Sequence, residues 1–350
     1  MSRYHTWALY FLTLQVVLKS SCFSIAEATA RRDTYKHHKK CTMSLCLFLM
    51  TKNDWPSLQS WILYHGELVG MENIHVIDDS DDVNALMFLK RAQEKKKLKV
   101  TYTNSSLSDL SNEITNIMLS SRPYCDFMMK MDTDEFLAVY SPETEAINIQ
   151  KPFLDAYLSN LIFDGKRYQI STLVSSVPSR VCGDPSTSIT SFTLSRFTDK
   201  GFYFRKAILP SKTFKSIDLG GHEGAVDSMF TGTAHRTDLA IVHFHERCYQ
   251  DVIQSAIKAV HSHKYVDKYL PEERQHEILE LFFKNSTSPC AIDSCHKLVQ
   301  WYNHVKDPVG NERNFYEYTD AKSQAAGVFR FTDLQSKITE LIANQDFVKS

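Results

Sequence analysis

From residue 41 onward, apolar runs of strand length alternate with apolar stripes of helical spacing. Leu45 to Met50 is a continuous apolar run, typical of a strand that is buried on both faces. A helical stripe from Leu58 to Val69 follows and ends at Gly70, as helices often end at a glycine. Further strands are predicted at Asn73 to Ile77 and at Phe127 to Met131. A strand-helix-strand unit repeated every roughly 25 to 30 residues predicts an α/β fold with a mostly parallel central sheet flanked by helices.

The later part of the chain predicts one more strand and then helices. Leu239 to Val242 is apolar, and a helical stripe from Val252 to Val260 comes after it. Another helix is expected after Pro271, and the tail from Leu298 to Val348 contains short amphipathic segments. We therefore expect a helical C-terminal extension, residues 266–350, that packs on a main domain of residues 41–265.

The N-terminal segment differs from the rest of the chain. Arg3 precedes an apolar run from Trp7 to Leu18, which is shorter than the roughly 20 residues of a membrane-spanning helix. Two small-x-small patterns, between Ala26 and Ala30, resemble cleavage sites. Residues 1–30 are therefore predicted to be a signal peptide or signal anchor, and residues 31–40 a basic stem. A buried N-terminal helix is the alternative.

Two N-glycosylation sequons, at Asn104 and Asn285, agree with entry into the secretory pathway. They place the expected location in the lumen of the Golgi or the endoplasmic reticulum, with membrane association through the N-terminal segment if it is not cleaved.

Charge argues against a general affinity for polyanions. The chain has 40 Lys plus Arg and 41 Asp plus Glu, for a formal net charge of −1. Binding to nucleic acid or to anionic lipid would need a local basic patch, and no nucleic-acid partner is expected. Neither GxGxxG nor GxxxxGK[ST] occurs, so the sequence lacks the usual dinucleotide and P-loop phosphate motifs.

Eight cysteines lack the paired CxxC spacing of structural zinc sites. Cys290 and Cys295 are close enough in sequence to form a local disulfide in an oxidising compartment. Cys46 lies inside an apolar run and is predicted to be a small core residue.

Acidic clusters follow two of the predicted strands. Asp78 and Asp79 come after the second strand, and Asp132 and Asp134 come directly after the strand ending at Met131. Ligands of parallel α/β sheets bind at the carboxyl ends of the strands. In extended chain, carboxylates at i and i+2 project from the same side, and such a pair suits a divalent cation that also binds a diphosphate. A solvated acidic turn is the alternative interpretation.

These motifs occur in an order that is similar to a known family. The segment CLFLMTKNDWPSLQSWILYHGELVGMENIHVIDDSDD and the later MKMDTDEFL resemble glycosyltransferases of the GT-A fold, specifically the family 2-like and family 92 (DUF23-like) group. A second block adds to the resemblance, namely Arg196-Phe197, Lys200-Gly201, Lys206, Gly221-His222, His243-Phe244-His245 and Arg247. The pair Asn53-Asp54 departs from the family, in which Asn-Glu is more usual.

The resemblance implies a metal-dependent, inverting transferase that moves a sugar from a nucleotide-sugar donor to a glycan or other hydroxyl acceptor. It implies Mn²⁺ or Mg²⁺ at Asp132 and Asp134, completed by His245 or His243. These two histidines follow an apolar strand and share one of its faces. Satisfied polar residues at a strand end are the alternative for them.

Cationic and acidic side chains provide the other candidates. Lys206, Arg205 and Arg247 are candidates to neutralise the charge of the diphosphate. The carboxylates Asp78, Asp79 and Asp132 are further candidates to bind the nucleotide-sugar donor. Glu223 lies in the glycine-dense stretch 220–224 and is the first candidate for a general base, with Glu135 and Glu246 as rivals. A metal-dependent hydrolase of sugar nucleotides and a non-catalytic carbohydrate-binding protein are the alternative functions.

Overall fold

The computed structural model describes residues 43–55, 57–104, 107–141, 143–144, 146–162, 164–178, 180, 194–198, 206–244, 248–262, 264–285, 295–326, 328–329 and 332–344. The chain divides into two compact units, residues 1–43 and 44–350, and every described helix and strand belongs to the second unit. Across these described residues, no helix combines the length and the apolar character needed to cross a membrane.

The first part of the second unit consists of parallel strands and their crossover helices. Its elements are β1 (Leu45–Thr51), α2 (Ser57–Val69), η1 (Met71–Asn73), β2 (Ile74–Asp78), α3 (Val83–Lys96), β3 (Lys99–Tyr102), α4 (Leu107–Ser121), η2 (Arg122–Tyr124) and β4 (Phe127–Met131). The strands pair in the order β3-β2-β1-β4, and all three pairings are parallel. Leu45 to Leu49 are buried, as expected for a strand covered on both faces.

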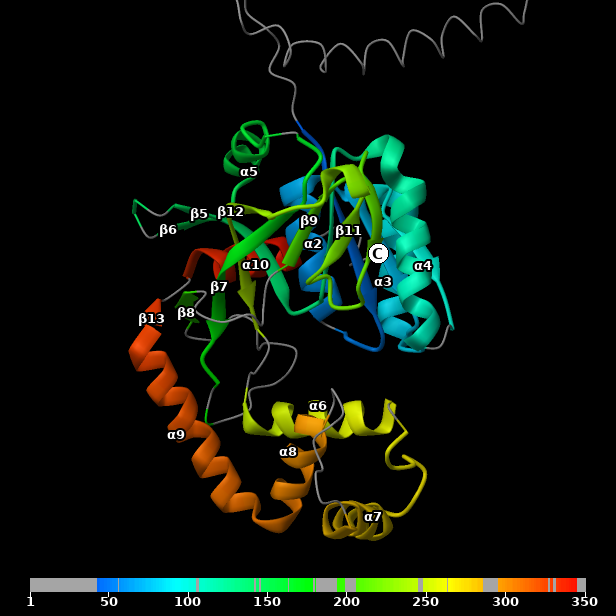
Figure 1. Ribbon diagram of the computed structural model, residues 1–350, viewed down its shortest axis with the longest axis vertical. Coiled ribbons are helices and arrows are strands. Elements are labelled where there is room, and N and C mark those ends of the chain that lie inside the picture. The colour runs from blue at the N-terminus through cyan, green and yellow to red at the C-terminus, as the bar shows by residue number, and fades with distance from the viewer. Residues whose placement is uncertain are drawn as a thin grey trace, which may run out of the picture. The chain divides into compact units, whose positions relative to one another are not determined.

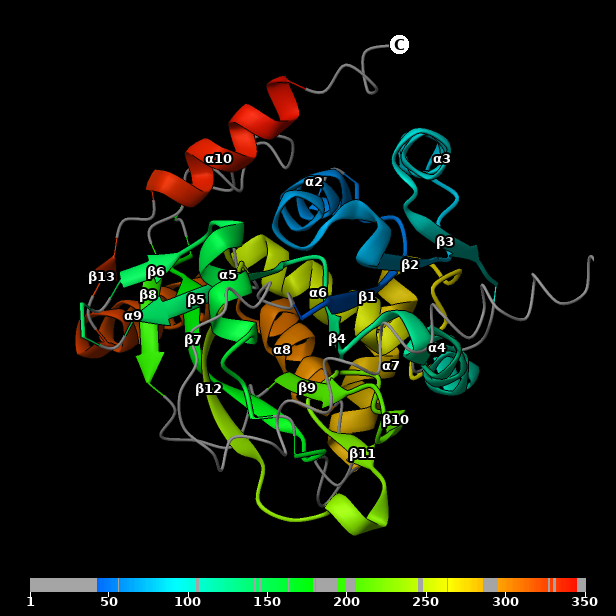
Figure 2. The same cartoon turned by 90° about the horizontal axis from the view of Figure 1, so that it is seen from above.

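The direction of strand order reverses next to β1. The chain steps outward from β1 to β2 and β3, and α4 then returns it to β4 on the other side of β1. Because crossovers are right-handed, steps in opposite directions place their helices on opposite faces of the sheet. Figure 2 shows this arrangement, with α2 and α3 on one side of these strands and α4 on the other. The gap between the ends of β1 and β4 is therefore a topological switch point.

Antiparallel pairings extend the sheet beyond β4. These elements are β5 (Glu135–Ser141), β6 (Ala146–Asn148), α5 (Lys151–Leu158), β7 (Tyr168–Ser176), β8 (Leu194–Thr198), β9 (Lys206–Pro210), β10 (Phe214–Ile217), β11 (Gly224–Val226), η4 (Ser228–Phe230) and β12 (His235–His243). From β4 the order continues β9-β7-β12-β5-β6, β8 pairs with β7, and β10 and β11 form a separate hairpin. Since β9 and β5 run opposite to β4 and β12, they begin where those strands end.

One edge of the sheet thus collects many strand ends. We call it the carboxyl edge, and it contains the ends of β1, β2, β4 and β12 and the starts of β5 and β9. The opposite edge, where β1 to β4 begin, is called the amino edge. Parallel pairing and strand direction alone decide which residues meet at each edge.

Helices dominate the C-terminal part. They are α6 (Tyr249–Ser262), α7 (Glu272–Asn285), α8 (Cys295–Lys306), α9 (Pro308–Ala326) and α10 (Thr332–Ala343), with a short strand β13 (Val328–Phe329) that pairs with β8. Buried Ala256, Leu279 and Trp301 join α6, α7 and α8 in one core, and Lys337 of α10 forms a 2.7 Å ion pair with Glu67 of α2. Figure 1 shows the helices and strands of the second unit. The predicted α/β fold, with parallel central strands, flanking helices and a helical C-terminal region, is confirmed.

A disulfide joins β1 to Cys125, which lies between η2 and β4. Cys46 and Cys125 are bonded, with 5.7 Å between their Cα atoms. Cys46 is buried, as predicted, but the interpretation of it as only a small core residue is wrong. Parallel pairing of Cys46 with Met128 brings the Cys125 thiol alongside. Cys248 is also disulfide-bonded. The predicted disulfide between Cys290 and Cys295 stays a prediction, because Cys290 lies outside the described residues.

Candidate functional site

The acidic motif after β4 forms a tight turn. The backbone N–H of Glu135 donates to the carbonyl of Asp132 at 3.1 Å, and β5 begins at Glu135. The expectation that Asp132 and Asp134 lie on extended chain is therefore wrong, because the chain must turn there to pair with β12. As a consequence, the two aspartates have different neighbours.

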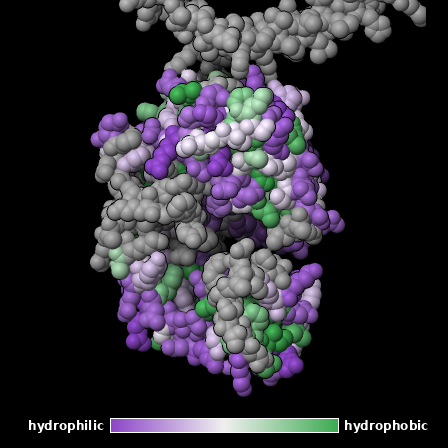
Figure 3. Space-filling model, viewed as in Figure 1, coloured by the Kyte–Doolittle hydropathy of each residue, from purple (hydrophilic) through white to green (hydrophobic). Residues whose placement is uncertain are grey.

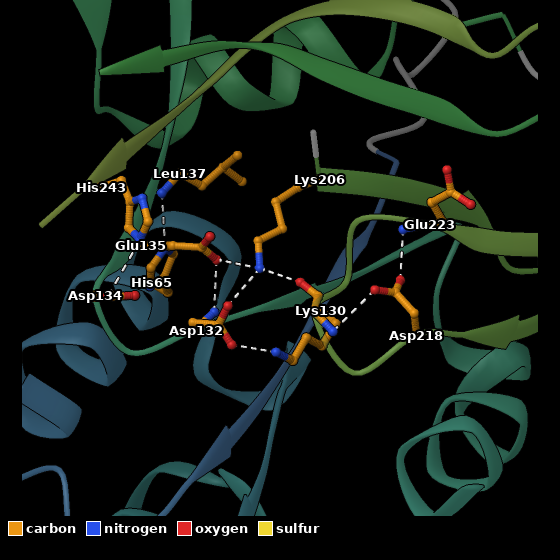
Figure 4. A network of polar contacts seen from close by, with 11 residues as sticks. His65, Lys130, Asp132, Asp134, Glu135, Leu137, Lys206, Asp218, Glu223 and His243 are labelled. Carbon is orange, nitrogen blue, oxygen red and sulfur yellow. Dashed lines mark hydrogen bonds and ion pairs between the residues drawn. The ribbon is translucent and has the colours of Figure 1, made fainter. Parts of the chain in front are cut away.

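Asp132 belongs to a lysine-carboxylate cluster, defined here as Lys130, Asp132, Glu135 and Lys206 (Figure 4). The Lys206 ammonium lies 2.7 Å from Asp132 Oδ2 and 2.9 Å from Glu135 Oε2, and it donates to the Gly220 carbonyl at 2.5 Å. Lys130 forms an ion pair with the other oxygen of Asp132. Glu135 Oε2 also accepts from the Asp132 backbone N–H at 2.9 Å.

The cluster is buried at its base and open at its top. The Lys206 side chain is 1 % exposed, whereas that of Asp132 is 42 % exposed. Lys206 was predicted to face the diphosphate, but its ammonium already has three acceptors inside the protein. It is therefore placed to hold Asp132 and Glu135, and Asp132 presents the cluster to solvent.

Burial and the paired charges act against each other on these groups. Burial would raise the pKa of Asp132, but Lys130 and Lys206 together bring that pKa below its usual range. Burial raises the pKa of Glu135 in spite of Lys206. Burial alone would lower the pKa of Lys206, yet Glu135 and Asp132 raise it, so Lys206 stays protonated. Two lysines thus balance two carboxylates.

Asp134 and His243 form a second pair beside the cluster. His243 ends β12, pairs with Glu135 in the strand register, and places Nε2 3.4 Å from Asp134 Oδ2. The next backbone N–H, of Phe244, donates to the Asp134 carbonyl at 2.8 Å. Burial would lower the pKa of His243, but the contact with Asp134 and the charge of Glu135 raise it. The far half of the chain thus contributes an imidazole to the acidic turn.

Within the part of the chain that the structure describes, two buried polar atoms at the ends of β1 and β2 have no hydrogen-bond partner. They are Thr51 Oγ1 and Asp78 Oδ2, and the two residues are paired in the parallel register. The other carboxylate oxygen, Asp78 Oδ1, accepts from Ser80 Oγ at 2.6 Å. Burial raises the pKa of Asp78, although the hydrogen bonds from Ser80 oppose the shift. A buried polar atom without a hydrogen-bond partner is unfavourable unless a ligand or a water molecule forms a hydrogen bond with it.

The neighbouring loop after β1 is shaped by its own polar contacts. Asn53 has a positive φ of 50° and its side-chain carbonyl accepts from the N–H groups of Asp81 and Asp82. Lys52 forms a 2.5 Å ion pair with Asp79. Thr133 donates a hydrogen bond to Asp54, which spans the switch point between β1 and β4. The loops after β1, β2 and β4 are therefore linked at the carboxyl edge.

The glycine-dense stretch lies against the same cluster. Gly221 has a φ of +68°, and a Cβ there would lie 2.8 Å from the Lys130 carbonyl, so only glycine fits without a shift. Asp218 accepts from the backbone N–H of Glu223 at 2.7 Å. The exposed Glu223 carboxylate points away from the lysine-carboxylate cluster in Figure 4.

Helix α2 supports the start of β5, a role that the sequence interpretation missed. His65 Nε2 accepts from the Leu137 N–H at 3.1 Å, and His65 Nδ1 lies 2.9 Å from the Trp61 carbonyl. Because that carbonyl can only accept, the proton of neutral His65 is on Nδ1. Tyr64 donates to the Leu137 carbonyl at 2.6 Å. Two adjacent polar side chains on an apolar helix stripe were the available signal.

The structure thus unites most of the described candidates. Asp132, Asp134, Glu135, Lys206 and His243 lie together, and Asp78 and Asp79 lie at the neighbouring strand end. Arg205, His245, Glu246 and Arg247 lie outside the described residues. In the space-filling view, hydrophilic residues line a hollow at the level of the carboxyl edge (Figure 3). Taken among the described residues only, no group of three or more His, Cys, Asp or Glu could hold a metal ion.

Comparisons with known proteins find only weak structural similarity. No family model and no curated protein sequence matches the chain. Among solved structures, S. aureus TarS 1–349 in complex with UDP-GlcNAc is 12% identical with a TM-score of 0.33, over 86% of this chain and 92% of that chain. The mannosyltransferase PcManGT from Pyrobaculum calidifontis, in complex with GDP-Man and Mn²⁺, is 12% identical with a TM-score of 0.31, over 94% and 96%.

A longer TarS chain is matched over 55% of its length, at 13% identity and a TM-score of 0.32. TM-scores of this size carry no argument about family or activity. The proposals below therefore rest on this chain's own residues.

Proposed function

We propose that this protein is a glycosyltransferase that uses a nucleotide-sugar donor bound at the carboxyl edge. The observation that carries the proposal is the pair of unpartnered buried atoms, Thr51 Oγ1 and Asp78 Oδ2, at the topological switch point. Ligands of open α/β sheets bind in that crevice. The Thr51 hydroxyl and the Asp78 carboxylate can form hydrogen bonds with a nucleobase or a ribose. The resemblance to GT-A glycosyltransferases also supports a nucleotide sugar as the ligand.

Charge balance at the site favours a divalent cation. The two lysines of the lysine-carboxylate cluster are already matched by two carboxylates, so a nucleoside diphosphate would bring uncompensated negative charge. Asp134 and His243 fit a shared Mn²⁺ or Mg²⁺: ligand bonds of about 2.1 Å put adjacent donor atoms roughly 3 Å apart, close to the 3.4 Å found here. His245 and the donor phosphates are the proposed further ligands.

The bound ion would neutralise the departing diphosphate as a Lewis acid. In this proposal Asp132 orients the donor from the top of the cluster, with Lys206 and Lys130 fixing both of its oxygens. Arg247 and Arg205 are proposed to add positive charge from segments outside the described residues. Preorganised charges of this kind stabilise a leaving group without reorganising during the reaction.

Glu223 is our proposed general base for an inverting transfer. Its carboxylate is exposed, whereas that of Glu135 is buried and is already bound by Lys206 and by the Asp132 N–H. A base must reach the acceptor hydroxyl, so a solvent-facing carboxylate on a loop beside the cluster suits the role better. Glu246 remains a rival candidate. The acceptor is proposed to be a glycan or another glycoconjugate hydroxyl.

The cellular setting is proposed from the sequence. The apolar segment 7–18 and the two sequons support the lumen of the Golgi or the endoplasmic reticulum. The disulfide between Cys46 and Cys125 also suits an oxidising compartment. Protein made in eukaryotic cells should change its electrophoretic mobility when its glycans are removed. An unchanged mobility would contradict use of the sequons.

A donor-binding experiment tests the function. The purified protein is titrated with a panel of nucleotide sugars, with and without Mn²⁺, and Asp78→Ala is compared with the control Asp155→Ala on α5. We expect saturable binding of at least one donor, weakened at least tenfold by Asp78→Ala and unchanged by the control. Absence of binding to the whole panel would refute the proposal. Donor turnover that no acceptor accelerates would instead indicate a sugar-nucleotide hydrolase.

A further inference from the structure

One side of strand β5 lacks a neighbouring strand at the end that carries the acidic turn. On this side, β6 pairs with β5 only from Val139 to Ser141. On the other side, β12 pairs with β5 from Glu135 to Val139. Leu137 therefore lies on β5 before the pairing with β6 begins, and it is buried. The backbone N–H and C=O groups of a buried residue need hydrogen-bond partners, so Leu137 must find them outside the sheet.

Two adjacent side chains of α2 take the place of the missing strand. His65 Nε2 accepts from the Leu137 N–H at 3.1 Å, and the Tyr64 hydroxyl donates to the Leu137 carbonyl at 2.6 Å. A neighbouring strand would offer Leu137 the same two partners, one acceptor and one donor. Both side chains are buried, so water does not compete for these hydrogen bonds. Figure 4 shows the hydrogen bond of His65 and, close to it, the contact between Asp134 and His243.

His65 remains an acceptor at neutral pH. Its Nδ1 lies 2.9 Å from the Trp61 carbonyl, which places the proton of the neutral ring on Nδ1. Burial lowers the pKa of His65 to about 3, so the ring stays neutral and Nε2 keeps its lone pair. The hydrogen bond to Leu137 is therefore a permanent anchor of β5.

Aromatic packing connects α2 to both members of the Asp134–His243 pair. The centre of the Phe136 ring lies 5.7 Å from that of His65 and 5.4 Å from that of Phe244. Phe244 directly follows His243, and its backbone N–H donates to the Asp134 carbonyl at 2.8 Å. The helix thus contacts the residue that follows each member of the pair by at most one further side chain.

The register of β5 decides which side chains meet at the site. Glu135 pairs with His243, and a slip of one residue would move each side chain of β5 to the opposite face. Apolar packing of α2 on β5 cannot set this register, because hydrophobic contacts are not directional. Two hydrogen bonds to the single residue Leu137 can set it. The distance between Asp134 and His243 depends on that register.

We propose that Tyr64 and His65 are positioning residues that hold Asp134 at the distance from His243 that a shared metal ion requires. This inference rests on the proposed function, in which that pair binds Mn²⁺ or Mg²⁺. In this role neither side chain binds the ion, and both act through Leu137. Functional sites must be held within about 0.5 Å of their working geometry. Loss of either hydrogen bond should therefore weaken metal binding although every ligand is still present.

The test measures Mn²⁺ binding to the purified full-length protein, from the electron paramagnetic resonance signal of the free ion. Tyr64→Phe removes one hydroxyl and keeps the ring. The matched control is Thr213→Val, which removes another buried hydroxyl that donates to a backbone carbonyl, that of Gly165 at 2.6 Å, at the amino edge. Asp134→Ala reports on the ion site itself. Urea unfolding of every variant separates loss of metal affinity from loss of stability.

We expect Tyr64→Phe to weaken Mn²⁺ binding at least about fivefold, since outer partners of metal ligands typically contribute about tenfold or more. Thr213→Val should lose a similar amount of stability and keep its Mn²⁺ affinity. His65→Leu should weaken Mn²⁺ binding as Tyr64→Phe does. His65→Gln should weaken it less, because its amide oxygen can replace Nε2 as the acceptor. If His65→Leu does not fold, Tyr64→Phe decides the question.

Three results would contradict the inference, and they separate it from the proposed function. Unchanged Mn²⁺ affinity in Tyr64→Phe, with weakened binding in Asp134→Ala, would overturn the positioning role and leave the proposed function standing. Equal weakening in Thr213→Val would also overturn that role, because general loss of stability would then explain the effect. Mn²⁺ affinity that Asp134→Ala does not change would remove the proposed metal site, and the positioning role with it.

Discussion

The two edges of the sheet use charge in opposite ways. At the carboxyl edge, Lys130 and Lys206 are buried and each forms an ion pair with a carboxylate, so their charges are fixed in place by short contacts. At the amino edge, Lys95, Lys96 and Lys97 at the end of α3 and Lys212 after β9 are exposed to solvent. Buried charges need partners whereas exposed charges do not, so the first edge is specific and the second is adaptable.

Removing one lysine from each edge gives the largest expected contrast. Lys206→Met leaves the buried Glu135 and its neighbour Asp132 without their shared cation, and should lower the free energy of unfolding by about 3 kcal/mol. Lys212→Met, on the exposed turn after β9, should change it by less than about 0.5 kcal/mol. Urea unfolding at pH 7.5 measures both. Similar losses at the two positions would show that burial of Lys206 does not distinguish the edges.

The second contrast concerns a substitution that should lower activity and leave stability unchanged. Asp134→Ala should reduce kcat/KM by more than tenfold, about 1.4 kcal/mol of barrier, if Asp134 and His243 hold the metal as proposed. Its thermal unfolding temperature should hardly change, because removing one of several close carboxylates relieves repulsion. Asp227→Ala, which sits near the amino edge and pairs with Lys215, is the matched control. Retention of more than a tenth of wild-type kcat/KM would remove Asp134 from the site.

The smallest expected contrast is between His65 and an uncharged replacement of it on acidification. Burial lowers the pKa of His65 to about 3, despite its hydrogen bond to the Trp61 carbonyl. In the unfolded chain, a histidine side chain has a pKa of about 6.5. Between these values the unfolded state binds a proton that the folded state does not, so stability falls as pH falls below about 6.5, by at most about 1.4 kcal/mol per pH unit.

Unfolding in urea at pH 7.5 and 5.5 checks this expectation. Wild type should lose about 1.4 kcal/mol more than His65→Gln over this interval, since the variant has no group to protonate at that position. An identical pH dependence for wild type and His65→Gln would show that His65 is not held neutral.

The sequence predicted the parallel half of the sheet well because each of its elements is encoded locally. The apolar run that became β1, the stripe of α2 and the strand ending at Met131 are all readable from spacing alone. The turn of residues 132–135 was misjudged as extended chain, because its cause is the pairing of Glu135 with His243, more than a hundred residues away. Local patterns contain no information about such a partner.

Other features were not predictable for the same reason. Lysines are usually solvated, so nothing near Lys206 except the apolar residues after it indicated burial. Cys46 and Cys125 are 79 residues apart and have no spacing signal. The residues that meet at the amino edge come from distant parts of the sequence, so they could not be grouped before the strand directions were known.

The Cys46–Cys125 bond turns the parallel half of the protein into a covalent ring. The ring contains α2, β2, α3, β3 and α4 and closes at β1 and β4, the two strands beside the switch point. Closing a loop of this length restricts the unfolded chain by about 4.5 kcal/mol in the chain-entropy description. A protease that cuts once inside the ring would therefore release no fragment. The two pieces would migrate together on a gel until a reductant separates them.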